Sequence, residues 1–109
     1  MKYNFLARHL LIIGTLLSCF QVYAAEIEVA QKGKQFSQKT VKVKVGDSVN
    51  FKNEDPFFHN IFSLSNTKTF DLGSYPQGQS KKVTFDKPGI VDVECAIHPE
   101  MKMVVEVKK

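Results

Sequence analysis

Apolar and polar residues alternate along most of the chain after residue 24. Val41, Val43 and Val45, for example, alternate with Lys42 and Lys44. This period of two is typical of β-strands with one buried face, and no later stretch keeps a helical period over three turns. Comparable short apolar segments lie at residues 27–29, 49–51, 61–64, 83–85, 91–95 and 104–107.

Residues that favour turns separate these segments. They are Gly46-Asp47, Asp55-Pro56, the stretch from Gly73 to Gly78, and Lys87-Pro88-Gly89. About seven short strands within residues 25–109 predict an all-β domain, either a sandwich of two sheets or a small barrel.

The first 24 residues follow a different pattern. Lys2 and Arg8 precede an apolar run of 11 residues, Leu10–Phe20, which is too short to span a bilayer. Val22-Tyr23-Ala24 then offers small residues where a signal peptidase cleaves, so residues 1–24 are predicted to be a secretory signal peptide. Residues 25–109 would form one domain without a transmembrane span.

A second processing route stays open, because Leu16-Leu17-Ser18-Cys19 resembles the lipobox of bacterial lipoproteins. In that case Cys19 would carry a lipid anchor. Both routes predict export, and we expect the protein in a bacterial periplasm.

Charge excludes one class of partner. Without residues 1–24 the chain keeps 13 Lys and 11 acidic residues, so its net charge is 13 − 11 = +2. This balance is too even to indicate nucleic-acid binding, and the lysines are scattered as on solvated faces. We therefore expect no nucleic-acid partner.

The predicted mature chain contains few soft donors. They are Cys95, His59, His98, Met101 and Met103. A single Cys cannot form an internal disulfide, so it is a core thiol, an intermolecular bridge or a ligand. Cys95 ends a predicted strand with its sulfur inward, and the Pro that follows His98 predicts a tight loop carrying His98 and Met101.

Two imidazoles, one thiolate and a weak axial thioether form the ligand pattern of a blue-copper site. Sulfur donors suit Cu(I), whereas imidazole also suits Cu(II). Zinc would accept the same groups except the thioether, so copper is favoured. The sequence therefore predicts one type 1 copper ion.

Two motifs resemble those of the cupredoxin family, in particular its amicyanin- and plastocyanin-like group. The first is Cys95-Ala-Ile-His98-Pro-Glu-Met101, and the second is Asp55-Pro-Phe-Phe-His59-Asn60. The stretch Val45–Phe51 is similar to the strand-turn-strand that precedes the second motif. The resemblance extends from about Ile27 to Val107.

The resemblance implies a Greek-key β-sandwich of seven to eight strands. It also implies that His59, Cys95 and His98 are equatorial copper ligands, with Met101 as the axial ligand. Asn60 would tie the first-ligand segment to the backbone beside the Cys. Met103 is the alternative axial ligand. Because Met103 shares the parity of the core-facing residues Val105 and Val107, we expect it to pack in the core, which favours Met101 as the ligand.

The resemblance further implies a monomeric carrier of single electrons, working between redox partners such as cytochromes or a periplasmic oxidoreductase. One edge of His98 would reach an apolar docking patch. Pro56, Pro99 and one of Phe57 and Phe58 are candidates for that patch, with the other Phe inward. The alternative is a protein that delivers or buffers copper.

We expect no enzymatic activity. Copper oxidases and nitrite reductases need further His-rich sites, and two His within residues 25–109 cannot supply them. The pair Glu54-Asp55 is interpreted as a solvated turn rather than as an acid-base pair.

Overall fold

The computed structural model describes residues 23–109, which form eight strands. The predicted signal peptide lies outside the described residues except for Tyr23 and Ala24, as does Cys19. Within the described part, no helix is long and apolar enough to cross a membrane. The strands are β1 (Glu26–Gln31), β2 (Thr40–Lys44), β3 (Ser48–Asn53), β4 (His59–Ser65), β5 (Lys68–Tyr75), β6 (Ser80–Thr84), β7 (Gly89–Cys95) and β8 (His98–Lys108).

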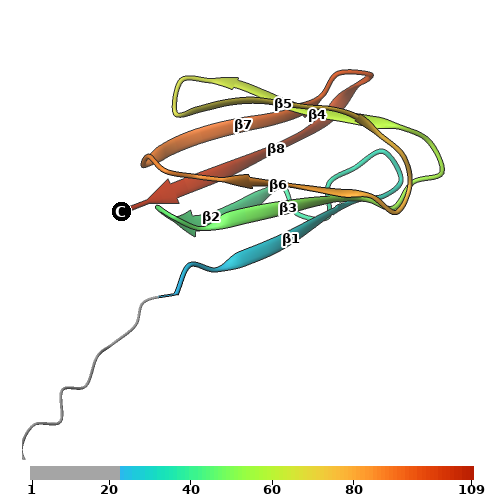
Figure 1. Cartoon of the computed structure of the whole chain (residues 1–109). Helices are drawn as coiled ribbons and strands as arrows, with labels where there is room; N and C mark the ends of the chain where they lie inside the picture. Colours follow the sequence, from blue (N-terminus) through green and yellow to red (C-terminus); the bar gives the residue numbers. More distant parts are fainter. Residues whose placement is uncertain (1–22) are drawn as a thin grey trace, which may run out of the picture.

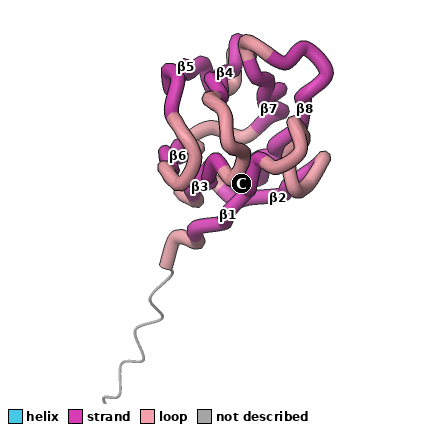
Figure 2. The backbone as a smooth tube through the Cα atoms, turned by 90° about the vertical axis from the view of Figure 1, so that its right-hand side faces the viewer, coloured by secondary structure: helices cyan, strands magenta, loops and turns pink. Residues whose placement is uncertain are grey.

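Two sheets stack on one another (Figure 1). One has the order β1-β3-β6 and the other has the order β2-β8-β7-β4-β5. The pairs β1–β3 and β2–β8 are parallel, whereas the other neighbouring strands are antiparallel. Viewed from the side, the chain passes repeatedly from one sheet to the other (Figure 2). The structure thus confirms the predicted all-β sandwich.

Alternating side chains form the core between the sheets, as the period of two predicts. In β2, for example, Val41 and Val43 are buried while Lys42 and Lys44 are exposed. The fully buried centre contains Val29, Val49, Phe51, Ile61, Phe85, Val91, Val93 and Val105.

The predicted turn from Gly73 to Gly78 is wrong in its first half. Gly73 lies within β5, and the chain turns only at residues 76–79, where the Gln79 amide donates to the Pro76 carbonyl at 3.2 Å. β5 is an edge strand whose polar residues hide any alternation. Because most side chains of β5 are exposed or only partly buried, the strand contains few apolar residues.

The predicted loop at residues 98–101 is also wrong, because β8 already begins at His98. Cys95 pairs with His98 and Glu94 pairs with Lys102, so residues 99–101 bulge from the β7–β8 ladder. Pro99 lacks an amide hydrogen and is tolerated there because the bulge leaves no ladder bond for it to donate. Only Ala96 and Ile97 connect the two strands.

Candidate metal centre

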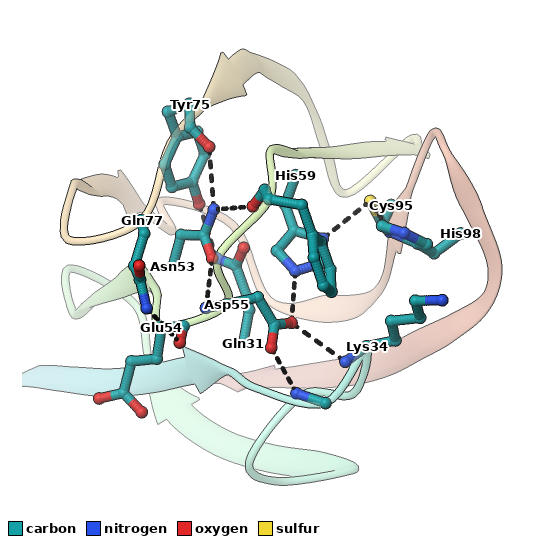
Figure 3. A network of polar contacts seen from close by, with 12 residues as sticks. Gln31, Lys34, Asn53, Glu54, Asp55, His59, Tyr75, Gln77, Cys95 and His98 are labelled. Carbon is teal, nitrogen blue, oxygen red and sulfur yellow. Dashed lines mark hydrogen bonds and ion pairs between the residues drawn. The ribbon is translucent and has the colours of Figure 1, made fainter.

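His59, Cys95 and His98 converge at one end of the sandwich (Figure 3). His59 is the first residue of β4, Cys95 is the last of β7 and His98 is the first of β8. The Cys95 Sγ atom lies 3.5 Å from His59 Nδ1 and 3.6 Å from His98 Nδ1. Their three donor atoms lie within 4.8 Å of one another, so sheet pairing brings together residues 36 positions apart.

These separations fit a bound transition-metal ion. A sulfur and a nitrogen held about 2.3 Å and about 2.0 Å from the same ion are roughly 3.5 Å apart when the angle between them is close to tetrahedral. One thiol and two imidazoles are also the donors that copper prefers. His59 and Cys95 are buried whereas His98 is half-buried, so the site is closed on one side only.

Met101 and Met103 both point into the core, so strand parity does not separate them. Their exposed fractions are 1% and 3%. Their positions along β8 do differ, because Met103 pairs with Val93, below the ligand end of β7, while Met101 lies in the bulge between His98 and Lys102. Met101 therefore lies at the level of the three donors.

Asp55 is the functional residue that the sequence interpretation missed. The sequence predicts a solvated turn at this position, but only 4% of Asp55 is exposed. Its Oδ2 atom lies 2.8 Å from His59 Nε2, on the side of the ring away from Cys95 (Figure 3). The spacing of four residues between Asp55 and His59 is the only sequence signal for this contact.

The hydrogen bonds of Asp55 determine which nitrogen of His59 carries the proton. Asp55 also accepts the main-chain amides of Gly33 at 2.6 Å and Lys34 at 3.0 Å. An ionised carboxylate only accepts, so Nε2 of His59 must be the protonated nitrogen. The lone pair of Nδ1 then faces Cys95, which is the tautomer needed to bind a metal.

The pKa of Asp55 lies below its ordinary value, which keeps this carboxylate ionised. Burial alone raises the pKa, but the hydrogen bonds from His59 and from the amides of Lys34 and Gly33 together outweigh that effect.

The turn that supplies these amides is itself unusual. Gly33 and Lys34 both adopt left-handed conformations, with φ angles of 66° and 60°. For Lys34 this conformation costs about 1 kcal/mol. The Asp55 carboxylate offsets the cost by accepting both amides, so the same side chain holds the metal-binding imidazole and this surface turn.

A network of buried hydrogen bonds holds the main chain at Asp55. The Asn53 side chain accepts the Asp55 amide at 2.8 Å and donates to the carbonyls of Phe57 and Tyr75. The Tyr75 hydroxyl accepts from Gln31 at 2.7 Å and donates to the Phe51 carbonyl at 3.0 Å. Burial raises the pKa of Tyr75 to about 12, so it remains a neutral phenol. These bonds fix the loop before His59.

Asn60 makes the predicted connection with its main chain rather than its side chain. Its carbonyl accepts the amide of Ala96, the residue after Cys95, at 2.9 Å. Its side-chain amide instead donates to Asp71 at 2.9 Å, because β5 brings Asp71 alongside. Any residue type at this position can supply the carbonyl.

The Phe57 ring packs against both imidazoles. It lies 5.4 Å from the His59 ring and 5.5 Å from the His98 ring, between centroids. The pKa of His98 lies below its ordinary value, firstly because of burial and further because of the nearby positive charge of Lys34. His98 is therefore held as the neutral imidazole that a metal requires.

Apolar side chains gather around His98, with Lys34 and Glu100 as the charged residues that line the same hollow. Phe57, Phe58 and Ile97 are 36%, 54% and 54% exposed. Pro56 and Pro99 are exposed as well. Both Phe57 and Phe58 are exposed, so the expectation that one of them is buried in the core is wrong; Phe57 instead packs against the two imidazoles at the surface. We call these five residues the apolar end.

Comparison with known proteins agrees with this geometry. The family model for copper binding proteins of the plastocyanin/azurin family matches residues 23–108. Amicyanin-alpha of Methylorubrum extorquens is 29% identical over 107 residues, which cover 95% of this chain and 90% of that protein.

Two solved structures show the same fold. A reduced mutant of amicyanin superposes with a TM-score of 0.72 at 25% identity, covering 81% of this chain and 87% of that one. A copper-containing nitrite reductase from Thermus scotoductus gives a TM-score of 0.73 at 25% identity over 87% of this chain. This chain spans only 25% of that reductase.

The matched residues include both motifs and therefore His59, Cys95, His98 and Met101. His59, Cys95, His98 and Met101 are positioned as a type 1 copper site, and the cofactor of this family is copper. The chain belongs to the plastocyanin/azurin family of copper binding proteins, the cupredoxins.

Proposed function

We propose that this protein is a periplasmic carrier of single electrons, not an enzyme. A copper ion held by His59, Cys95 and His98, with Met101 as the axial ligand, would supply the one-electron change. The observation that carries the proposal is the convergence of three donor atoms within 4.8 Å, directly beneath an apolar surface.

The chain's own residues suit this task because they hold the donors in place. Strand pairing at Ile61–Cys95 and Cys95–His98 holds Cys95 between β4 and β8, and His59 pairs with Tyr75 of β5. The Asp55 carboxylate fixes the His59 ring, and the Phe57 ring covers both imidazoles. If the ligands keep the same positions in both oxidation states of copper, little reorganisation accompanies electron transfer. The activation free energy of the transfer is then low.

The half-buried His98 offers the path to a partner. Its ring lies next to the apolar end, where a redox protein could exclude water over a small contact. Electron-transfer complexes bury little surface and dissociate quickly, which suits a patch of a few apolar side chains. A periplasmic cytochrome or oxidoreductase is the partner class that we propose.

Stopped-flow mixing with a reduced c-type cytochrome tests this function. We expect rapid bleaching of the oxidised protein in a second-order reaction. Transfer of copper to an apo acceptor protein is measured in parallel. Fast copper transfer combined with slow reduction would contradict the proposal and favour copper delivery.

Replacing Ile97 by Lys tests the docking surface. A buried ammonium opposes close contact, so we expect the second-order rate constant to fall about tenfold, equivalent to about 1.4 kcal/mol. The visible spectrum should not change. Leu64→Lys is the matched control, because Leu64 is 74% exposed on β4, away from the metal centre, and should leave the rate unchanged. Equal rates for both variants would exclude the apolar end as the docking site.

Replacing Met101 by Leu tests the axial ligand. Although a thioether also suits Cu(I), its axial lone pair stabilises the doubly charged Cu(II) ion more than the singly charged Cu(I) ion. Leucine offers no lone pair, so the substitution should raise the reduction potential while the blue colour persists. A tenfold change in the relative affinity for the two oxidation states corresponds to ~59 mV, and we expect a rise of about this size by protein-film voltammetry. Met103→Leu should leave the potential unchanged. The opposite result would assign the axial role to Met103.

A further inference from the structure

The main chain of Ala25 is held at both of its polar groups. Its nitrogen donates to Asp47 Oδ1 at 2.8 Å, and its carbonyl accepts the amide of Ser48 at 2.9 Å. Ala25 lies immediately before β1, and the start of β1 is at the opposite end of the sandwich from the β7–β8 connection, where Cys95 and His98 lie (Figure 1). Ala24 is exposed. The main chain is therefore fixed by hydrogen bonds from the first residue after residue 24.

Asp47 is a junction between the two sheets. Its Oδ2 atom accepts the Lys44 amide at 2.8 Å, where β2 ends, and its carbonyl accepts the Phe85 amide at 2.9 Å. Only 8% of Asp47 is exposed. The hydrogen bonds from the amides of Ala25 and Lys44 lower its pKa, so the carboxylate is ionised at neutral pH. In the full chain this anion faces main-chain amides.

We propose that Asp47 is the receptor for a new N-terminus formed by cleavage of the Ala24–Ala25 bond. The inference rests on the export included in the proposed function. Hydrolysis by a signal peptidase consumes one water, leaves a carboxylate on Ala24 and leaves an ammonium group on Ala25. That ammonium occupies the position of the amide now bonded to Asp47, so processing converts this bond into an ion pair.

The pair would strengthen an existing contact, because the Ala25 nitrogen already lies 2.8 Å from Asp47 Oδ1. Hydrogen bonds between ionised groups are roughly twice as strong as neutral ones. Other charges nearby are Lys42 and Lys44 on β2, which line the same surface hollow and oppose the ammonium, and Glu26, which follows it in the chain. The hydrogen bond to Asp47 is the contact that places the Ala25 nitrogen beside an anion.

The sign of the pH dependence follows from linkage. An unfolded α-amino group has a pKa of about 7.7–8.0, and pairing with Asp47 raises that pKa in the folded state. The added stability is therefore fully present below about pH 7.7 and is lost as the pH rises through the higher folded value. A chain that starts one residue earlier has no charge at Ala25 and lacks this dependence.

Two purified proteins test the proposal, one starting at Ala25 and one starting at Ala24. Both are also prepared with Asp47→Asn, and all four carry the same copper load. At pH 6 we expect the chain starting at Ala25 to melt a few degrees higher than the longer chain. The difference should shrink at pH 10 and should be absent in the Asp47→Asn pair. Equal melting temperatures, or a difference that persists in the Asp47→Asn pair, would overturn the proposal.

Intact-mass measurement of the exported protein provides the second arm. A mass that starts at Ala25 supports the proposed processing, whereas a lipidated Cys19 or an unprocessed chain overturns it. Neither measurement depends on the copper chemistry. Failure here is therefore distinct from failure of the electron-carrier function, which the absorption spectrum and stopped-flow rates report.

Discussion

Replacing Cys95 by Ser is expected to abolish the blue colour of the copper-loaded protein. The colour of a type 1 site comes from charge transfer between a thiolate sulfur and Cu(II), and a serine hydroxyl stays protonated at neutral pH. Cys95 is 3% exposed and is the only thiol in the described residues, so no other sulfur anion can replace it. We expect complete loss of the visible band, measured by absorption at one equivalent of Cu(II).

The control for this variant is Met103→Leu, which removes a buried sulfur from β8 at a position paired with Val93. It should keep the full colour. Thermal melting of the metal-free proteins shows whether Cys95→Ser still folds. A folded Cys95→Ser variant with an undiminished blue band would refute the role of Cys95 as ligand.

Replacing Asp55 by Asn is expected to weaken copper binding by about 10–100-fold, the usual effect of losing a partner that orients a ligand. The amide cannot satisfy all three donors that the carboxylate accepts. If its oxygen faces His59 and Lys34, its NH₂ group meets the Gly33 amide. If its NH₂ group faces His59, the proton of His59 must move to Nδ1, which then cannot bind a metal.

The position of the His59 proton can be measured directly. Long-range ¹H–¹⁵N spectra of the metal-free wild-type protein should show His59 protonated at Nε2 only, with Asp55→Asn altering either this signal or the Gly33 amide. Asp47→Asn is the matched control, because Asp47 also accepts two main-chain amides but touches no ligand. Unchanged copper affinity in Asp55→Asn, or a wild-type His59 protonated at Nδ1, would contradict this role.

Local patterns were sufficient to predict most of the fold. Strands such as β2, with Val41 and Val43 buried and Lys42 and Lys44 exposed, carry their orientation in their own sequence. The orientation of β5 is not readable from its sequence, because an edge strand needs few buried residues. Its Gly and polar residues are also typical of a turn. Pro99 led to the wrong prediction of a loop at residues 98–101. Only the pairing of β7 with β8 shows the bulge in which a Pro is tolerated within the strand.

The metal donors could be predicted because soft donors are rare in this chain, so few combinations existed. The contacts of the residues around these donors could not be predicted. Asp55 looked like a solvated acid, and its burial depends on the turn at Gly33 and Lys34, 22 and 21 residues away in the sequence. The direction of the Asn60 side chain likewise depends on Asp71 in the strand that the sequence did not reveal.

Titration of the purified mature protein with Cu(II), followed by visible absorption, tests the central assignment most directly. We expect an intense blue band that saturates at one equivalent and disappears when ascorbate is added. A colourless adduct, or a band that continues to grow beyond one equivalent, would show that Cys95 and the two imidazoles do not bind one copper ion together.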